Sequence, residues 1–227
     1  MNNTKTILVV ILVASLIMTS CGQTTKSGSN SGQIITIQNG PSFKTVNIGK
    51  QIWMTENLNV DKFRNGDPIP EAQTVKEWEK AGKEGKPVWC YFMYDPANME
   101  KYGKLYNWYA VNDTRVLAPL GWHVPTDAEW STLEFFLGDD AGNKLKSTKD
   151  WVSFDNQTNQ TGFSAVPGGL CFGTGLFIPE EGRGYWWSST EDSPGYIWVR
   201  GLSSNDNKVS KGKMGMEDGC SVRCIKD

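Results

Sequence analysis

The N-terminal end of the chain has a hydrophobic pattern unlike that of the rest. A short polar start with Lys5 precedes a mainly apolar run from Ile7 to Met18, and two small residues then lead to Cys21. A membrane-spanning helix needs roughly 20 apolar residues, so this run is too short to span. A charged start, a short apolar run and small residues are typical of a secretory signal. The pattern therefore predicts a signal peptide over residues 1–20.

Cys21 stands where the apolar run stops. The segment that ends there resembles the lipobox of bacterial lipoproteins, in which the cysteine becomes the lipidated first residue of the mature chain. The resemblance implies a lipid on Cys21 that anchors the protein in the bacterial cell envelope, at the outer membrane, on either its periplasmic or its outer face. A plain secretory signal with an unmodified cysteine is the alternative.

The segment after the signal consists of small and polar residues. Residues 22–32 are glycine, serine, threonine, asparagine, glutamine and one lysine, and such a segment cannot bury apolar surface. We expect residues 21–40 to form a flexible tether. From residue 41 onwards tryptophan and glycine are frequent and turn signals recur. Residues 41–227 are therefore expected to form one domain with a single core.

Two helix starts are marked by capping boxes. The segment Thr74-Val-Lys-Glu77 predicts a short surface helix from 75 to about 83, and Thr126-Asp-Ala-Glu129 predicts a second helix that Gly138 ends. Four apolar residues fall on one face of the second helix: Trp130, Leu133, Phe136 and Leu137. This face is expected to pack on the core.

The other regular elements have the pattern of strands. Residues 46–54 alternate around Gly49-Lys50, which predicts a hairpin. The last third of the chain contains short β-prone runs separated by glycine, asparagine and serine: 162–166, 185–190, 196–202 and 221–225. Helices in the first half and antiparallel strands in the second predict an α+β fold.

Charge and metal-ligand content exclude two kinds of partner. The formal net charge is -2 and there is no basic stripe, so nucleic-acid binding through phosphate contacts is not expected. The chain has a single histidine, His123, and no C-x-x-C spacing, which argues against a metal site. We expect neither a metal nor a cofactor.

Four cysteines remain once Cys21 is assigned to the lipid: Cys90, Cys171, Cys220 and Cys224. An even number in an exported chain favours two disulfides, and three connectivities are possible. Cys220 and Cys224 are four residues apart in an extended segment, so they share a face but lie too far apart for a comfortable bridge. Each is therefore expected to pair elsewhere.

Several segments, taken in order, resemble a known family. They are Trp53–Leu58, Asp95–Asn98 with Tyr102-Gly103, Leu105–Ala110, Leu117–Trp130, Lys144–Lys146, Gly162–Gly169, Gly184–Glu191 and Ser221–Asp227. Together they resemble the Fibrobacter succinogenes major paralogous domain (FISUMP) family, over about residues 43–227. The resemblance implies a secreted or lipid-anchored protein, and most such proteins have no assigned activity.

That family in turn resembles the formylglycine-generating (sulfatase-modifying) enzymes. The segment Gly121–Trp130 is similar to their G-[WY]-R-L-P-T-E-A-E-W helix start, and the closing Ser221–Cys224 is similar to their terminal G-F-R strand. This likeness implies a C-type-lectin-like fold, with two main helices packed on a twisted antiparallel sheet and long loops.

The resemblance also implies a cysteine pairing. FISUMP-like chains tend to carry cysteines near the positions of Cys90 and Cys224, which implies a Cys90–Cys224 disulfide. Cys171 and Cys220 are then an additional pair of this chain, and we expect a Cys171–Cys220 disulfide.

Catalysis is not expected. The resemblance to the formylglycine-generating enzymes implies an oxidase activity in which two nearby cysteines hold copper. This activity is kept as an alternative. Here the close pair is Cys220 and Cys224, which lies in the terminal strand and is spaced one residue too closely. His123 is the only conventional general base near neutral pH. It precedes a helix cap, where we expect a structural hydrogen bond.

A binding surface is the preferred hypothesis. Neighbouring residues on a strand face opposite ways, so one of Trp186 and Trp187 is expected to face outward, joined by Tyr185, Trp198 and Arg200. Loops 155–161 and 173–182 are expected to frame it. Exposed aromatics beside small polar residues suit a glycan or an envelope protein. The alternatives are that loops cover both indoles, or that the protein is a structural subunit of an envelope assembly.

Overall fold

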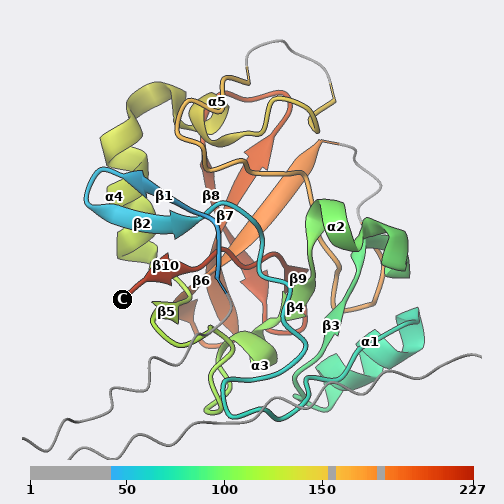
Figure 1. Ribbon diagram of the computed structural model, residues 1–227. Coiled ribbons are helices and arrows are strands. Elements are labelled where there is room, and N and C mark those ends of the chain that lie inside the picture. Colours follow the sequence, from blue (N-terminus) through green and yellow to red (C-terminus); the bar gives the residue numbers. More distant parts are fainter. Residues whose placement is uncertain (1–41, 153–156, 178–181) are drawn as a thin grey trace, which may run out of the picture. The chain divides into compact units, whose positions relative to one another are not determined.

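Mostly short helices and strands make up the domain (Figure 1). The structure, a computed structural model, describes residues 42–152, 157–177 and 182–227. The helices are α1 (Val75–Lys83), α2 (Met99–Tyr102), α3 (Trp108–Val111), α4 (Asp127–Leu137) and α5 (Ala141–Leu145). The strands are β1 (Thr45–Ile48), β2 (Gln51–Met54), β3 (Trp89–Cys90), β4 (Leu105–Asn107), β5 (Trp122–His123), β6 (Arg183–Ser193), β7 (Tyr196–Ser203), β8 (Ser210–Gly215), β9 (Gly219–Cys220) and β10 (Ile225–Lys226).

These strands form three antiparallel sheets, in the orders β1-β2-β10-β5, β3-β4-β9 and β6-β7-β8. The mixture of helices and antiparallel sheets confirms the expected α+β character. The hairpin expected at 46–54 is present as β1 and β2, and Gly49 in the turn has φ +61°, a conformation that favours glycine. Strand β10 lies between β2 and β5, with Ile225 opposite both Trp53 and His123. The last strand of the chain is thus held by the first hairpin.

The C-terminal part of the domain differs from expectation at two places. In the sheet β6-β7-β8 the edge strand β8 has the sequence SKGKMG, which lacks alternating apolar residues, yet it pairs along its length with β7. Lysine-rich sequence is common on edge strands, where charge prevents further pairing. The expected strand at 162–166 forms only a single bridge, between Ala165 and Lys146.

Helices begin at both predicted N-caps, but only the box at Thr126 is complete, because the Glu77 carboxylate accepts from the Gln73 N–H and not from that of Thr74. The Thr126 side chain accepts from the backbone N–H of Glu129 at 3.2 Å, and the Glu129 carboxylate accepts from the Thr126 N–H at 2.8 Å. Helix α1 has the predicted bounds, with Thr74 as its N-cap. One expectation is wrong: Phe136 is 62% exposed. At about 100° per residue it lies roughly 60° beyond Leu133, at the edge of the buried stripe.

Two hydrophobic clusters lie on the two sides of β6. Trp187 belongs to the larger, which contains Tyr106 and Trp108. Trp186 belongs to the other, which α4 covers with Trp130. A third, smaller cluster surrounds Trp78, Cys90 and Cys171. In the described part of the chain, no helix has the length and apolar character that crossing a membrane requires.

Candidate functional site

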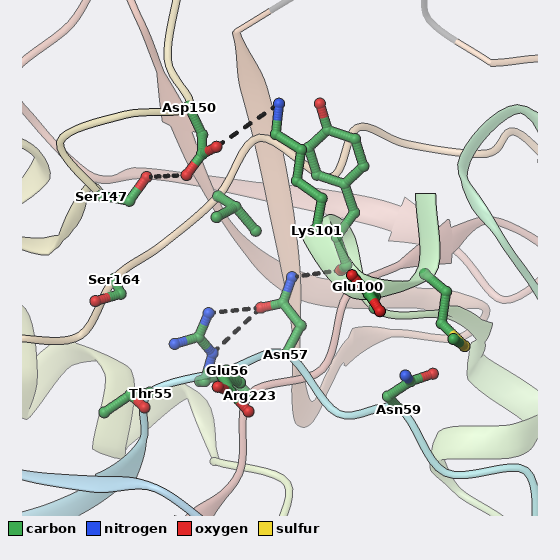
Figure 2. Close-up of a pocket in the computed structure, with 14 residues that line it drawn as sticks. Thr55, Glu56, Asn57, Asn59, Glu100, Lys101, Ser147, Asp150, Ser164 and Arg223 are labelled. Carbon is green, nitrogen blue, oxygen red and sulfur yellow. Dashed lines mark hydrogen bonds and ion pairs between the residues drawn. The ribbon is translucent and has the colours of Figure 1, made fainter. Parts of the chain in front are cut away.

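A cavity of about 410 Å³ is lined by the segment after β2, by helix α2 and by parts of the 147–166 region (Figure 2). Its volume lies in the range of small-molecule sites. Polar side chains make up ten of the lining residues, although apolar atoms cover about as much of the wall as polar ones: Thr55, Glu56, Asn57, Asn59, Glu100, Lys101, Ser147, Asp150, Ser164 and Arg223. Segments far apart in the sequence therefore build one hydrogen-bonding surface.

Asn57 holds one side of the cavity in place. Its Oδ1 accepts hydrogen bonds from Nη2 and Nε of Arg223, at 2.7 and 3.2 Å, and from Nε1 of Trp186 at 2.9 Å. Its Nδ2 donates to the Tyr102 carbonyl at 2.9 Å and to the Ser221 hydroxyl at 3.2 Å. Both amide hydrogens and the amide oxygen are used, so the side chain has one orientation. The Asn57 amide thus joins α2, β6 and the terminal segment.

Arg223 is a buried cation behind this amide, with its side chain 0% exposed. Its Nη1 donates to the carbonyl oxygens of Met54, at 3.2 Å, and Phe163. None of the ion pairs among the described residues includes Arg223. Burial lowers the pKa of Arg223 to about 9, because removal from water disfavours the charged form. Neutral oxygen dipoles therefore solvate this charge.

Lys101 and Asp150 lie on the opposite side of the cavity and reach toward each other (Figure 2). The Lys101 ammonium is 3.7 Å from Oδ1 of Asp150, and Oδ2 of Asp150 accepts from the Ser147 hydroxyl at 2.8 Å. The same ammonium lies 4.8 Å from the centre of the Tyr102 ring. A hydrogen bond with Tyr102 raises the pKa of Lys101, burial lowers it, and Asp150 raises it, leaving it raised overall. Lys101 is thus charged at neutral pH.

The charges around the cavity nearly balance. The lining residues include two cations, Lys101 and the buried Arg223, and three carboxylates, Glu56, Glu100 and Asp150, which leaves a formal excess of one negative charge. A polyanion would gain little here. The described residues that line the cavity include no histidine or cysteine, and no group of three or more His, Cys, Asp or Glu in the described chain is placed to hold a metal ion. The wall is suited to hydrogen bonding with a polar, uncharged ligand.

His123 is not one of the residues that line this cavity. Its Nδ1 lies 2.7 Å from Oδ1 of Asp227 and its Nε2 lies 2.9 Å from Oε1 of Glu129. Burial lowers the pKa of His123, but the hydrogen bonds and charges of these two carboxylates raise it by more. The ring joins the last residue of the chain to the capping box of α4. This is the structural hydrogen bonding that the sequence predicts.

The expected outward-facing indole is absent. Trp186 and Trp187 do alternate across β6, but they are 1% and 0% exposed. Their indole N–H groups donate to Asn57 and, at 2.7 Å, to the carbonyl oxygen of Tyr106. The expectation that one indole faces outward is therefore wrong, because a hydrophobic cluster covers each side of the strand.

The other three residues of that predicted surface have different environments. Arg200 is 1% exposed and pairs with two carboxylates of α4, so it fastens β7 to this helix and is not part of an exposed surface. Trp198 is half-buried, with two lysine ammonium groups 3.8 and 5.0 Å from its ring centre. Tyr185 is also half-buried. Residues 155–156 and 178–181 of the expected framing loops lie outside the described residues.

The structure contains no disulfide among the four domain cysteines, and all four are buried. Cys90 and Cys171 belong to the cluster around Trp78, whereas Cys220 and Cys224 belong to the largest cluster. The expected Cys90–Cys224 and Cys171–Cys220 pairs each join one cluster to the other, and neither is formed. Cys21 lies outside the described residues.

The residues that build the cavity were not expected to do so from sequence. Asn57 and Arg223 stand in two of the segments that carry the family resemblance, Trp53–Leu58 and Ser221–Asp227. Their place in these segments was the sequence signal that could have pointed to them. The two residues are 166 positions apart, so no local spacing shows that they meet.

Comparison with known proteins agrees with this resemblance. The model of a family described as the Fibrobacter succinogenes major domain matches residues 46–226, nearly the whole described domain. No curated protein and no solved structure gives a significant match.

Proposed function

Since the chain belongs to the Fibrobacter succinogenes major domain family, we propose that it is a non-catalytic binding module of the bacterial cell envelope. A lipid on Cys21 anchors it and residues 21–40 form the tether. The apolar run that ends at Cys21, followed by small polar residues, supports this location. The domain has a C-type-lectin-like fold in this proposal. The capped helix α4, which begins within the segment similar to the formylglycine-generating enzymes, supports that assignment.

The ligand that we propose is a glycan without strong charge, bound in the cavity between Asn57 and Lys101. The observation that carries this proposal is the wall itself: hydroxyl, amide, ammonium and carboxylate groups line about 410 Å³. Sugar hydroxyls donate and accept hydrogen bonds, so they match such a mixed set. The exposed part of the Tyr102 ring, which also lines the cavity, offers an apolar face for a sugar ring.

Binding in this form needs no turnover and no metal. Asp150 is held by Lys101 and Ser147, so its carboxylate is positioned as an acceptor. The near balance of charge favours neutral sugars over phosphorylated ones. A ligand hydroxyl between Asp150 and Lys101 would accept from the ammonium and donate to the carboxylate.

The test is a glycan array probed with the full mature protein in detergent, followed by calorimetric titration of the best neutral oligosaccharide. Lys101→Met and Asp150→Asn are expected to weaken binding at least tenfold, since each removes a charge-assisted hydrogen bond. Lys83→Met is the matched control, because its ammonium pairs with Glu79 at 2.6 Å on α1, outside the cavity.

Three results would contradict the proposal. The array binds no neutral glycan, the two cavity variants bind as tightly as the wild type, or the control variant loses binding equally. Capture of an envelope protein through another surface, with no glycan bound, would favour the structural-subunit alternative.

A further inference from the structure

The sheet β3-β4-β9 sorts the cysteines onto two faces. In its register Tyr106 lies opposite both Trp89 and Cys220, and all three belong to the largest hydrophobic cluster. Cys90 lies opposite Leu105, and both belong to the cluster around Trp78. Successive residues of a strand point to opposite faces. Cys90 and Cys220 therefore lie on opposite sides of the sheet.

Cys171 is on the same side as Cys90. Its N–H donates to the carbonyl of Gly219 at 3.0 Å, and the Gly219 N–H donates back at 2.6 Å. A Cβ atom placed on Gly219 would lie 3.2 Å from Cβ of Cys171 and 2.6 Å from the Trp78 ring. Position 219 thus shares a face with Cys171, and the next residue, Cys220, points to the other face. A Cys171–Cys220 bond would have to cross the sheet.

The two thiols on this side share one small cluster. Cys90 and Cys171 both belong to the buried group around Trp78, and after burial the Cys171 side chain is the next cause that raises the pKa of the Cys90 thiol. The Tyr94 hydroxyl lies 3.8 Å from Sγ of Cys171 and donates to the Gly175 carbonyl at 2.8 Å. Tyr94 therefore covers the cluster on the side of the 171–177 turn.

We propose that Cys90 and Cys171 are joined by a disulfide in the mature protein, and that Cys220 and Cys224 remain thiols. Each of the two thiols loses its proton and one S–S bond forms. The two electrons reduce an oxidant of the disulfide class, which becomes two thiols. The bond closes a loop between positions 90 and 171 and fastens the 171–177 turn to β3.

The burial of the pair determines when the bond forms. Burial raises the pKa of the Cys90 thiol well above its ordinary value, and the thiolate is the form that reacts. Both sulfurs belong to residues that are 0% exposed. The exchange therefore occurs during folding, before the cluster closes, and the finished bond is shielded from reductants.

The test is to refold the full chain with oxidised and reduced glutathione, unfold it in guanidinium with an alkylating agent, and map the peptides without reduction. The expected result is a Cys90–Cys171 peptide, with Cys220 and Cys224 both alkylated. A Cys90–Cys224 or Cys171–Cys220 peptide, or four alkylated thiols, would overturn the proposal.

A second measurement does not depend on peptide recovery. The melting temperature of protein refolded in glutathione is expected to exceed that of protein refolded in a strong reductant by about 10 °C, as a long closed loop predicts. Cys90→Ala is expected to abolish this difference, and Cys224→Ala, a buried cysteine on the other side of the sheet, is expected to keep it. Equal melting temperatures of the two wild-type preparations, or the reverse behaviour of the variants, would contradict the bond.

Discussion

The amide oxygen of Asn57 accepts hydrogen bonds from both Nε and Nη2 of Arg223, a residue 166 positions away in the sequence. A buried guanidinium is thus held by a neutral amide and two backbone carbonyls. The same amide forms part of the cavity wall. A ligand in this cavity would therefore meet a surface that the core itself keeps rigid, which reduces the ordering cost of binding.

The stability of the domain is predicted to depend on this amide. Asn57→Leu removes the acceptor of Nε and Nη2 of the buried Arg223 and of the Trp186 N–H, so the free energy of unfolding should fall by about 3–5 kcal/mol. Denaturant unfolding measures the change. Asn59→Leu is the control, since Asn59 is an exposed neighbour in the same cavity, and should change stability by about 0.5 kcal/mol or less. Equal midpoints for the two variants would refute the assigned role.

The tryptophans of the C-terminal sheet are predicted to separate by burial. Trp186→Ala and Trp187→Ala should each cost about 3–5 kcal/mol of stability, because each leaves a large void in a packed cluster. Trp198→Ala should cost about 1 kcal/mol, because it loses a partly exposed ring and its lysine contacts. Thermal melts compare the three. A Trp187→Ala protein that melts like the wild type would show that its ring is not core.

His123 is predicted to make stability depend on pH. Its native pKa is raised above the ordinary 6.5, so its contribution is fully present below pH 6.5 and is lost as pH rises through the native pKa. The ring is 38% exposed, and solvent screening limits the effect to about 0.5–1 kcal/mol. As pH rises from 6.5 through the native pKa of His123, the denaturant midpoint of the wild type should fall, and the midpoint of His123→Gln should fall less. Parallel curves would exclude the effect.

Membrane attachment is predicted to depend on one thiol. Cys21→Ala should move the protein from the membrane fraction to the soluble fraction, because the lipid chains supply the apolar contact with the bilayer. Cys224→Ala, which changes a buried domain cysteine, should remain with the membranes. Fractionation with immunoblotting measures both, and mass spectrometry of the mature N-terminus identifies the modified residue. A mature chain that starts at another residue would refute the anchor.

Local features of the fold followed well from sequence. Thr126 and Glu129 start α4 in a capping box, and Gly138 ends it with φ +73°. The predicted hairpin turns at Gly49 and Lys50. These features depend on residues three to ten positions apart, and their energies arise from backbone groups that such neighbours satisfy. The periodicity of the segment 102–111 fits a strand as well as a helix, and the segment forms β4 followed by α3, which the Asn107 side chain caps.

The sequence alone determined the elements whose partners are close along the chain, the family and the signal-like N-terminus. Alternation along β6 also required Trp186 and Trp187 to face opposite ways. Only the tertiary structure decided what each face meets: both indoles are buried, Cys90 and Cys171 share one cluster, and Asn57 binds Arg223. The alternation of side chains along a strand shows that the strand has two faces, but the layers that cover these faces come from distant segments. Burial, cysteine pairing and the cavity wall are properties of that packing.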